Sequence, residues 1–186
     1  MRVIAGVAKG RKLQTVEGLF TRPTTDRIKE TLFNMIAFDL PQCKFLDLFS
    51  GSGAIGIEAL SRGAEHAVFV ENNLECQRMI EQNLIHTKLD KQARIVGLEM
   101  QKALLQLSNE KAVFDIIFLD PPYGAEMMQP TLLEIVQSGL LSKDGYIIAE
   151  HAAKIPLPSV SGLRILREKE YRTTVLTFLC LEEENI

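Results

Sequence analysis

The sequence predicts an α/β fold: an open, mostly parallel sheet with helices on both faces and a C-terminal antiparallel strand pair. Two observations carry this prediction. Short apolar runs alternate with helical patterns between residues 44 and 150, which is typical of buried parallel strands in βαβ units. The first of these runs leads directly into a glycine-rich loop followed by a helical pattern, the order found in nucleotide-binding α/β domains.

The central elements follow from apolar periodicity and from the residues that begin and end them. The predicted parallel strands are Phe45–Phe49, Ala67–Val70, Ala93–Val96, Val113–Leu119 and Tyr146–Ala149. A helix over Ala54–Arg62 should end at Gly63, because glycine adopts the left-handed conformation easily. A second helix should begin near Asn72, with Glu75 three residues on and a buried stripe of Cys76, Ile80 and Leu84. Two further helices are expected over Gln101–Leu107 and Met127–Ser138.

The two flanks of the chain differ from this central pattern. Thr24 or Thr25 can cap a helix over Asp26–Phe38, whose apolar stripe contains Ile28, Leu32 and Ile36. Residues 1–20 resemble a short β-hairpin or an extended arm. After the bend at Pro156 and Pro158, Leu163–Leu166 and Thr173–Leu181 predict the antiparallel pair. We therefore expect one domain over residues 1–186, in which residues 1–38 form a basic arm and a helix.

Composition restricts the class of protein. The chain has 186 residues, of which 46% are hydrophobic and 24% charged, a globular composition. Its three cysteines are far apart and its three histidines are scattered, so neither a disulfide framework nor a zinc site is expected. No signal peptide and no apolar run of membrane-spanning length is present. We expect a soluble cytoplasmic protein without a metal.

Charge is distributed unevenly along the chain. The net charge is −3, which argues weakly against a nucleic-acid partner. Residues 1–30, however, hold seven basic and three acidic side chains, so this segment is +4 and the remainder −7. Such asymmetry is typical of a basic arm on an acidic body. A solvated surface segment without a partner explains the same numbers.

The first predicted strand continues into Ser50-Gly51-Ser52-Gly53-Ala54-Ile55-Gly56, which matches the GxGxxG dinucleotide pattern in its required context. The glycines alone do not distinguish a dinucleotide from S-adenosylmethionine. Asp47, however, would repel the pyrophosphate of a dinucleotide and would attract a cationic ligand. Glu71 ends the second strand 24 residues later, where a carboxylate can accept both ribose hydroxyls. A plain glycine turn with a surface glutamate is the alternative.

A second motif, Asp120-Pro121-Pro122-Tyr123, ends the fourth strand, so it should lie beside the glycine loop. Its acceptors are the Asp120 carboxylate and proline carbonyls, which suit the two hydrogens of an aromatic amine. Held in this way, the amine nitrogen can attack a methyl group, with most of the rate coming from positioning and electrostatics. Tyr123 would stack on a base turned out of its helix or loop. A stiffened strand-to-loop turn is the structural alternative.

Together these motifs resemble the Rossmann-like amino-methyltransferases that use S-adenosylmethionine. The flanks make the resemblance narrower, to the RsmD-type bacterial 16S ribosomal RNA guanine-N2 methyltransferases, over nearly the whole chain. The segments that carry it are Met1–Gly6, Lys9–Leu13, Arg22–Glu30, Leu32–Asn34, Leu46–Gly53, Glu58–Gly63 and Asp120–Tyr123.

The resemblance implies methyl transfer to the exocyclic N2 amine of one guanine in 16S rRNA, naked or in an assembling small subunit. It implies catalytic roles for Asp120, Pro121, Pro122 and Tyr123. The implied cofactor-binding residues are Asp47, Phe49, Ser50, Gly51, Gly53, Glu71, Asn72, Glu99, Met100 and Asp120. The implied RNA-binding residues are Arg11, Lys12, Arg22, Thr24, Arg27, Lys29 and Tyr123. Glu99 departs from the family pattern, which often has Asp or Asn against the adenine.

Four other functions compete with this hypothesis. DNA-adenine methylation usually requires a target-recognition domain, for which 186 residues leave little room. Protein-glutamine enzymes usually carry Asn at the position of Asp120. The intact Asp120–Tyr123 motif argues against an RNA-binding protein that holds the cofactor without turnover. A nicotinamide oxidoreductase is the weakest alternative.

Three further residues are expected to have structural roles only. His151 is expected to be a hydrogen-bonded or surface histidine, Phe33 a core residue, and Cys43 no nucleophile.

Overall fold

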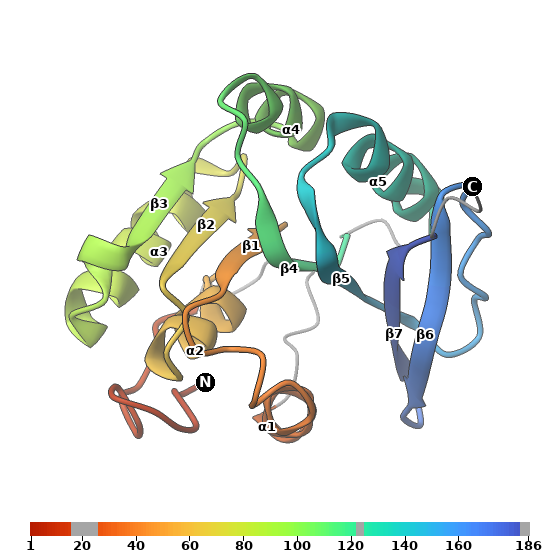
Figure 1. Cartoon of the computed structure of the whole chain (residues 1–186). Coiled ribbons are helices and arrows are strands. Elements are labelled where there is room, and N and C mark those ends of the chain that lie inside the picture. Colours follow the sequence, from red (N-terminus) through yellow and green to blue (C-terminus); the bar gives the residue numbers. More distant parts are fainter. Residues whose placement is uncertain (16–25, 122–124, 183–186) are drawn as a thin grey trace.

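The computed structural model describes residues 1–15, 26–121 and 125–182, with only the backbone described for residue 125. Within these residues the chain forms one seven-stranded sheet in the order β3-β2-β1-β4-β5-β7-β6 (Figure 1). The strands are β1 (Lys44–Leu48), β2 (His66–Val70), β3 (Ala93–Val96), β4 (Phe114–Leu119), β5 (Leu141–Ala152), β6 (Leu163–Glu170) and β7 (Thr174–Leu181).

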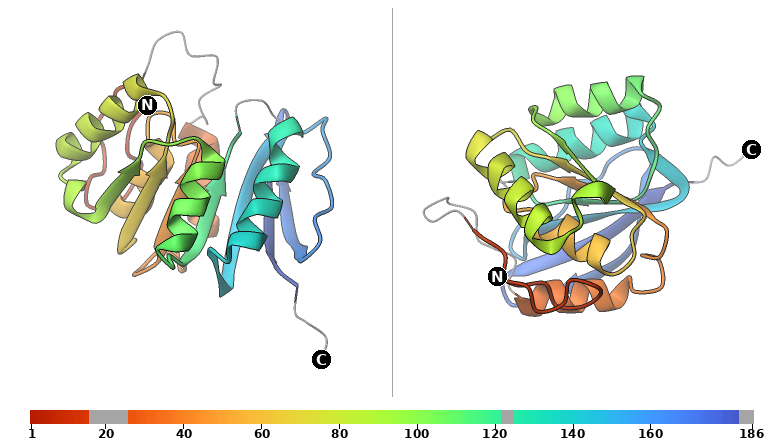
Figure 2. Two further views of the ribbon diagram at one scale, coloured as in Figure 1. Left: turned by 90° about the horizontal axis from the view of Figure 1, so that it is seen from above. Right: turned by 90° about the vertical axis from the view of Figure 1, so that its left-hand side faces the viewer.

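The helices alternate with the first five strands. They are α1 (Asp26–Met35), α2 (Ala54–Ser61), α3 (Leu74–Thr87), α4 (Met100–Asn109) and α5 (Ala125–Ser138), with a short 3₁₀ turn at Asp90–Gln92. Figure 1 shows α4 and α5 above the sheet and α1 and α2 below it, and the views in Figure 2 show the same two layers. The predicted alternation of strands and helices is confirmed.

Pairing within the sheet also follows the prediction. β1 pairs in parallel with both β2 and β4, and β4 pairs in parallel with β5. β7 is antiparallel to β5 and to β6, which confirms the C-terminal antiparallel pair. The fold is therefore the mostly parallel, open α/β sheet that the sequence predicts.

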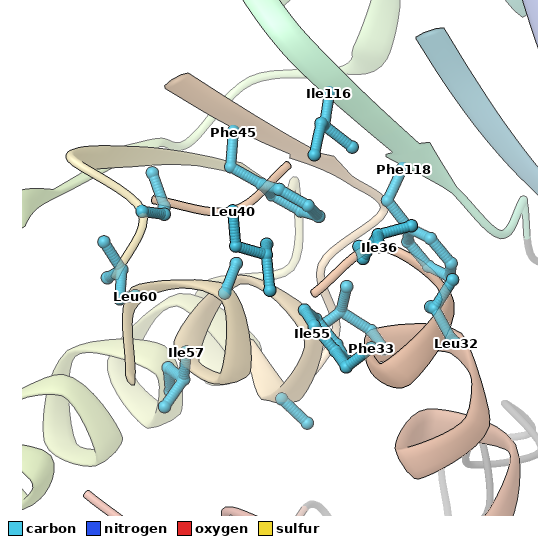
Figure 3. Close-up of a cluster of buried hydrophobic side chains, with 14 of the residues drawn as sticks. Leu32, Phe33, Ile36, Leu40, Phe45, Ile55, Ile57, Leu60, Ile116 and Phe118 are labelled. Carbon is cyan, nitrogen blue, oxygen red and sulfur yellow. The ribbon is translucent and has the colours of Figure 1, made fainter. Parts of the chain in front are cut away.

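Two apolar cores lie on opposite faces of the sheet. On one face, Phe45, Phe69 and Phe118 pack against α1, α2 and α3, and Figure 3 shows the part of this core between α1, α2, β1 and β4. On the other face, Leu46 and Ile117 pack against α4 and α5. Residues that are neighbours in a strand thus enter different cores, because side chains alternate across a strand.

Several predicted boundaries were wrong. The first helix ends at Met35 rather than Phe38, because the chain turns there and the Asp39 N–H donates to the Ile36 carbonyl at 3.0 Å. The α3 helix is capped by Asn73 rather than Asn72, since the Asn73 side chain accepts the N–H groups of its first turn. β5 extends well beyond the expected Tyr146–Ala149 through a register shift against β4. The caps expected at Thr24 or Thr25 lie outside the described residues.

The first 15 residues form a tight loop and no regular strand. An isolated antiparallel bridge joins Arg2 to Lys12, and the Val3 N–H donates to the Arg11 carbonyl at 3.0 Å. Val3 and Leu13 are buried against the core, so this segment packs on the domain. The expected hairpin is present only as this narrow loop, which we call the N-terminal loop (residues 1–15). No described helix is long and apolar enough to cross a membrane.

Candidate active site

The candidate site lies at the carboxyl ends of the parallel strands, where the strand order reverses. The chain leaves β1 toward β2 on one side of the sheet, and later β4 joins β1 on the other side. Ligands of open α/β sheets bind at such a reversal. Leu48 is in register with Val70 and Leu119, and Leu119 with Ala149. The next residue of each strand therefore lies in one row, which contains Phe49, Glu71, Asp120 and Glu150.

The glycine loop joins β1 to α2 through backbone conformations that favour glycine. Phe49, Gly51 and Gly53 all have positive φ, at 62°, 54° and 75°. Gly56 is required for a different reason: a Cβ there would lie 2.4 Å from Cε1 of Phe69. The helix that follows the loop therefore approaches β2 more closely than a larger residue would allow.

Asp47, on β1, is bonded to the start of the helix that follows this loop. Its side chain is 1% exposed, and its Oδ2 accepts the Gly56 N–H at 2.9 Å. Burial raises the pKa of this carboxyl to about 7, and the charge of Glu71 contributes, while the Gly56 hydrogen bond opposes the rise. Asp47 was expected to contact the cofactor, but in this structure its side chain is buried and bonded to the first turn of α2, so that contact stays a prediction. Its charge can favour a cationic ligand without direct contact.

Glu71 closes the loop from the side of β2. Its Oε2 accepts the Gly51 N–H at 2.8 Å, and its Oε1 accepts the Asn73 N–H at 2.9 Å. Each carboxylate oxygen retains a lone pair for a hydroxyl donor. Ser50 supports the same turn, since its hydroxyl donates to the Asp47 carbonyl at 2.6 Å. The carboxylate is thus fixed in place before any ligand arrives.

A pocket of about 260 Å³ opens beside Glu71. Its walls are mostly apolar with a few polar groups, as in small-molecule sites. The lining residues are Phe49, Val70, Glu71, Asn72, Leu98, Glu99, Met100, Gln101 and Met127. These residues include two carboxylates and no basic side chain, so the pocket suits a neutral or cationic ligand better than a dinucleotide.

Five of the predicted cofactor-binding residues meet at this pocket, namely Phe49, Glu71, Asn72, Glu99 and Met100. Their contacts with the cofactor stay predictions. The sequence reasoning missed four lining residues, Val70, Leu98, Gln101 and Met127. Three of the four are sequence neighbours of predicted residues, so position at the strand ends was a usable signal. Met127 comes from the start of α5 and gave no comparable signal.

Asp120 lies half-buried at the end of β4, in the same row as Glu71. Burial, together with the negative charges of Glu150 and Asp47, raises the pKa of its carboxyl to about 8. Pro121 follows and is buried. Pro122 and Tyr123 lie outside the described residues, so their predicted roles have no structural account. A carboxyl that titrates near neutrality can both accept a hydrogen bond and take up a proton.

The basic residues near the N-terminus fall into distinct groups. Lys12 and Arg27 are exposed, and Arg11 is half-exposed with its guanidinium donating to the His86 carbonyl. Arg22 and Thr24 lie outside the described residues. The expectation that Lys29 contacts RNA is wrong, because its side chain is 0% exposed.

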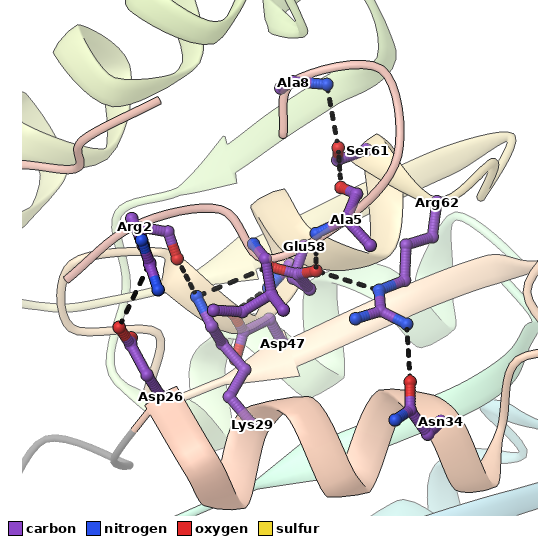
Figure 4. A network of polar contacts seen from close by, with 12 residues as sticks. Arg2, Ala5, Ala8, Asp26, Lys29, Asn34, Asp47, Glu58, Ser61 and Arg62 are labelled. Atoms are coloured by element: carbon purple, nitrogen blue, oxygen red, sulfur yellow. Dashed lines mark hydrogen bonds and ion pairs between the residues drawn. The ribbon is translucent and has the colours of Figure 1, made fainter. Parts of the chain in front are cut away.

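Lys29 instead belongs to a buried polar network around Glu58 (Figure 4). Its ammonium lies 3.4 Å from Glu58 Oε2 and donates to the Arg2 carbonyl at 2.6 Å. Burial lowers the pKa of Lys29, and the Glu58 carboxylate opposes that shift. Glu58 also accepts the backbone N–H groups of Ile4 and Ala5. This network attaches both α1 and the N-terminal loop to α2, the helix that follows the glycine loop.

The remaining single-residue expectations can be compared directly. Phe33 is fully buried, as predicted. His151 is hydrogen-bonded, with Nε2 2.9 Å from Thr177 Oγ1, which also agrees with the prediction. Cys43 is buried and burial raises its pKa to about 12, so its thiol does not ionise near neutrality.

Comparisons with known proteins agree with this geometry. The model of a family described as "Conserved hypothetical protein 95" matches residues 1–180. A Bacillus subtilis protein named "Putative rRNA methyltransferase YlbH" is 42% identical over 91% of this chain and 92% of its own length. "Ribosomal RNA small subunit methyltransferase D" of Escherichia coli K12 is 35% identical over 91% of this chain and 84% of its own. A solved structure titled "Putative methyltransferase yhhF from Escherichia coli" superposes with a TM-score of 0.87 at 32% identity, covering 98% of both chains.

Proposed function

This chain belongs to the Conserved hypothetical protein 95 family, and from that premise we propose that it methylates the N2 amine of a guanine in 16S rRNA, with S-adenosylmethionine as methyl donor. The family resemblance of its sequence to RsmD-type enzymes agrees with this membership. The relatives named as ribosomal RNA methyltransferases support rRNA as the substrate. The choice of guanine N2 and of the small subunit is the finer part of the proposal.

The observation that carries the proposal is the position of Asp120 at the end of β4, in the same row of strand ends as Phe49 and Glu71 of the pocket. The pocket offers a carboxylate for ribose hydroxyls at Glu71 and apolar walls for an adenine at Val70 and Leu98. The charges of Glu71, Asp47 and Asp120 together suit a sulfonium-bearing ligand, so the residues present fit the cofactor. S-adenosylmethionine, when bound, supplies an electrophilic methyl group on that sulfonium.

The residues of the chain would act mainly on the amine. Asp120 and the carbonyls of Pro121 and Pro122 would accept its two hydrogens and turn its lone pair toward the methyl group. Transfer of the methyl group would break its bond to the sulfonium, leave a neutral thioether and make the amine cationic, and the Asp120 carboxylate would then take up one of the amine hydrogens. A pKa of about 8 makes Asp120 a better proton acceptor than an ordinary aspartate. Tyr123 would stack on the guanine.

The basic residues outside the pocket would hold the RNA backbone. Arg11, Lys12 and Arg27 are accessible among the described residues, and Arg22 and Thr24 belong to the same proposal from the sequence. We propose that residues 1–38 act in this way as an extension of a single domain. Binding should then weaken as the salt concentration rises, because bound phosphates release counterions. The cytoplasm, where ribosomal subunits assemble, is the proposed location.

The test is methyl transfer to small subunits isolated from cells that lack the protein. We expect wild type to form N2-methylguanosine, identified by chromatography after nuclease digestion. Asp120→Asn should lower kcat/KM at least about 100-fold, the lower range for loss of a catalytic acid or base. Asp144→Asn is the matched control, because Asp144 is exposed near the other end of β5. Full activity of Asp120→Asn would refute the mechanism, and methylation of another base atom would refute the guanine-N2 assignment.

A further inference from the structure

Asn83 is a buried amide on α3 that joins two segments far from it in the sequence. Its side chain is only 1% exposed. Buried amides are normally fully hydrogen-bonded, because an unpaired polar group in the interior is costly. The partners of Asn83 therefore indicate what this side chain holds together.

All three hydrogen bonds of the Asn83 side chain go to backbone atoms of other segments. The Gln14 N–H donates to Oδ1 at 2.8 Å, and Nδ2 donates to the Gln14 carbonyl at 3.1 Å. The second hydrogen of Nδ2 goes to the Ser52 carbonyl at 3.0 Å. The amide oxygen accepts from the one N–H group, and the NH₂ group donates to the two carbonyls. These partners therefore determine which way round the amide lies.

Each end of this connection belongs to a different binding surface. Ser52 lies in the glycine loop, next to Gly51, whose N–H is held by the ribose-facing carboxylate of Glu71. Gln14 lies in the N-terminal loop, shortly after Arg11 and Lys12. A single side chain thus connects the loop that should carry the cofactor to the loop that should carry RNA phosphates.

We propose that Asn83 is a positioning residue that couples cofactor binding to RNA binding. The inference rests on the proposed function, because it assumes that both ligands bind this chain. A cofactor that fixes the glycine loop also fixes the Ser52 carbonyl, and through Asn83 it fixes Gln14 and the basic residues before it. By thermodynamic reciprocity, bound RNA must then tighten cofactor binding by the same factor.

The amide of Asn83 is the one side-chain type of its size that can make this set of contacts. Aspartate keeps an acceptor for the Gln14 N–H but loses both donors, and alanine keeps neither. Thr87 provides a matched control one turn later on the same helix. It is also buried, but among the residues that the structure describes its hydroxyl donates only to the carbonyls of Asn83 and Leu84 within α3.

The experiment measures the binding of small subunits from cells lacking the protein, by filter binding, with and without saturating S-adenosylhomocysteine. For wild type we expect the cofactor product to tighten RNA binding at least about 5-fold, the lower end of usual coupling factors. Asn83→Ala and Asn83→Asp should bring this ratio close to 1. Thr87→Ala should retain the wild-type ratio, although it also perturbs α3.

A further variant keeps the inference testable if substitutions at Asn83 prevent folding. Gln14→Pro removes the N–H that donates to Asn83 Oδ1, at an exposed position of the N-terminal loop, and should also lower the ratio. A wild-type ratio of 1, or an unchanged ratio in the folded variants, would overturn the coupling. Failure of wild type to methylate the subunits would instead contradict the proposed function, so the two failures are distinguishable.

Discussion

Replacing Glu58 with Leu should cost far more folding free energy than replacing its partner Lys29 with Met. Glu58 is 0% exposed and has four donors around its carboxylate. Ile4 and Ala5 donate their N–H groups at 2.8 and 3.0 Å, Arg62 donates Nε at 2.8 Å, and the Lys29 ammonium lies at 3.4 Å. The carboxylate is therefore the centre of the network, and each cation is only one of its partners.

The expected magnitudes follow from what each substitution leaves unpaired. Glu58→Leu leaves the buried Lys29 ammonium without its counter-charge and the backbone N–H groups of Ile4 and Ala5 without an acceptor, a situation that typically costs about 3–5 kcal/mol. Lys29→Met removes the charge and keeps a side chain of similar length, while the Glu58 carboxylate keeps Arg62 and both backbone N–H groups as partners. Its loss should be about 1–2 kcal/mol, close to that of one hydrogen bond to a charged group.

Urea unfolding followed by circular dichroism measures both free energies. Glu30→Gln, an exposed change next to Lys29 on α1, is the control and should stay within about 0.5 kcal/mol of wild type. Equal losses for Glu58→Leu and Lys29→Met would refute the reasoning, because they would mean that the ion pair alone carries the stability. A loss below about 1 kcal/mol for Glu58→Leu would show that water reaches the network.

Three other predictions concern the site. The raised pKa of Asp120, about 8, favours the neutral carboxyl, so a cationic ligand must drive its ionisation. The affinity for S-adenosylmethionine, relative to S-adenosylhomocysteine with its uncharged sulfur, should therefore rise from pH 6 to 9 in calorimetry. Asp120→Asn should flatten that rise. Glu71→Gln should weaken S-adenosylhomocysteine binding about 10-fold or more, because hydrogen bonds from the ribose hydroxyls to a charged carboxylate are lost. Glu75→Gln, at an exposed position, is the control and should leave the affinity unchanged. Equal affinities of the two variants would argue against the ribose role of Glu71. Gly56→Ala should cost about 1–3 kcal/mol in urea unfolding by forcing a Cβ against Phe69, and adding Phe69→Leu should recover part of it; a neutral Gly56→Ala would contradict the close packing.

The fold was predictable because its signals are local. Each buried strand of the parallel sheet is a short apolar run, and the helices between them show stripes that match their buried residues, such as Cys76, Ile80 and Leu84 on α3. Boundaries were less predictable, because they depend on hydrogen bonds between distant residues. β5, for example, continues to Ala152 because β7 pairs with it in antiparallel register.

The site was predictable where its residues follow strand ends and not where tertiary contacts create it. Glu71 and Asp120 terminate apolar runs, so the sequence places them at the same edge of the sheet. Asn83 has no such signal, because its partners lie 69 and 31 residues away and are backbone atoms. A backbone partner leaves no trace in residue type, so sequence reasoning could not find this connection.

Lys29 shows how a charged residue was misassigned although the sequence held the information. On α1 it lies three, four and seven residues before Leu32, Phe33 and Ile36, which is the spacing of one buried helix face. Glu58 is the one charged residue of α2, whose residues are all buried, so it required a buried partner. A lysine on one apolar stripe and a glutamate on another indicate an ion pair between helices. The positive charges that we propose to hold RNA are therefore those of Arg11, Lys12 and Arg27, and the first two lie in the N-terminal loop, which the Glu58 network and Asn83 hold against the domain.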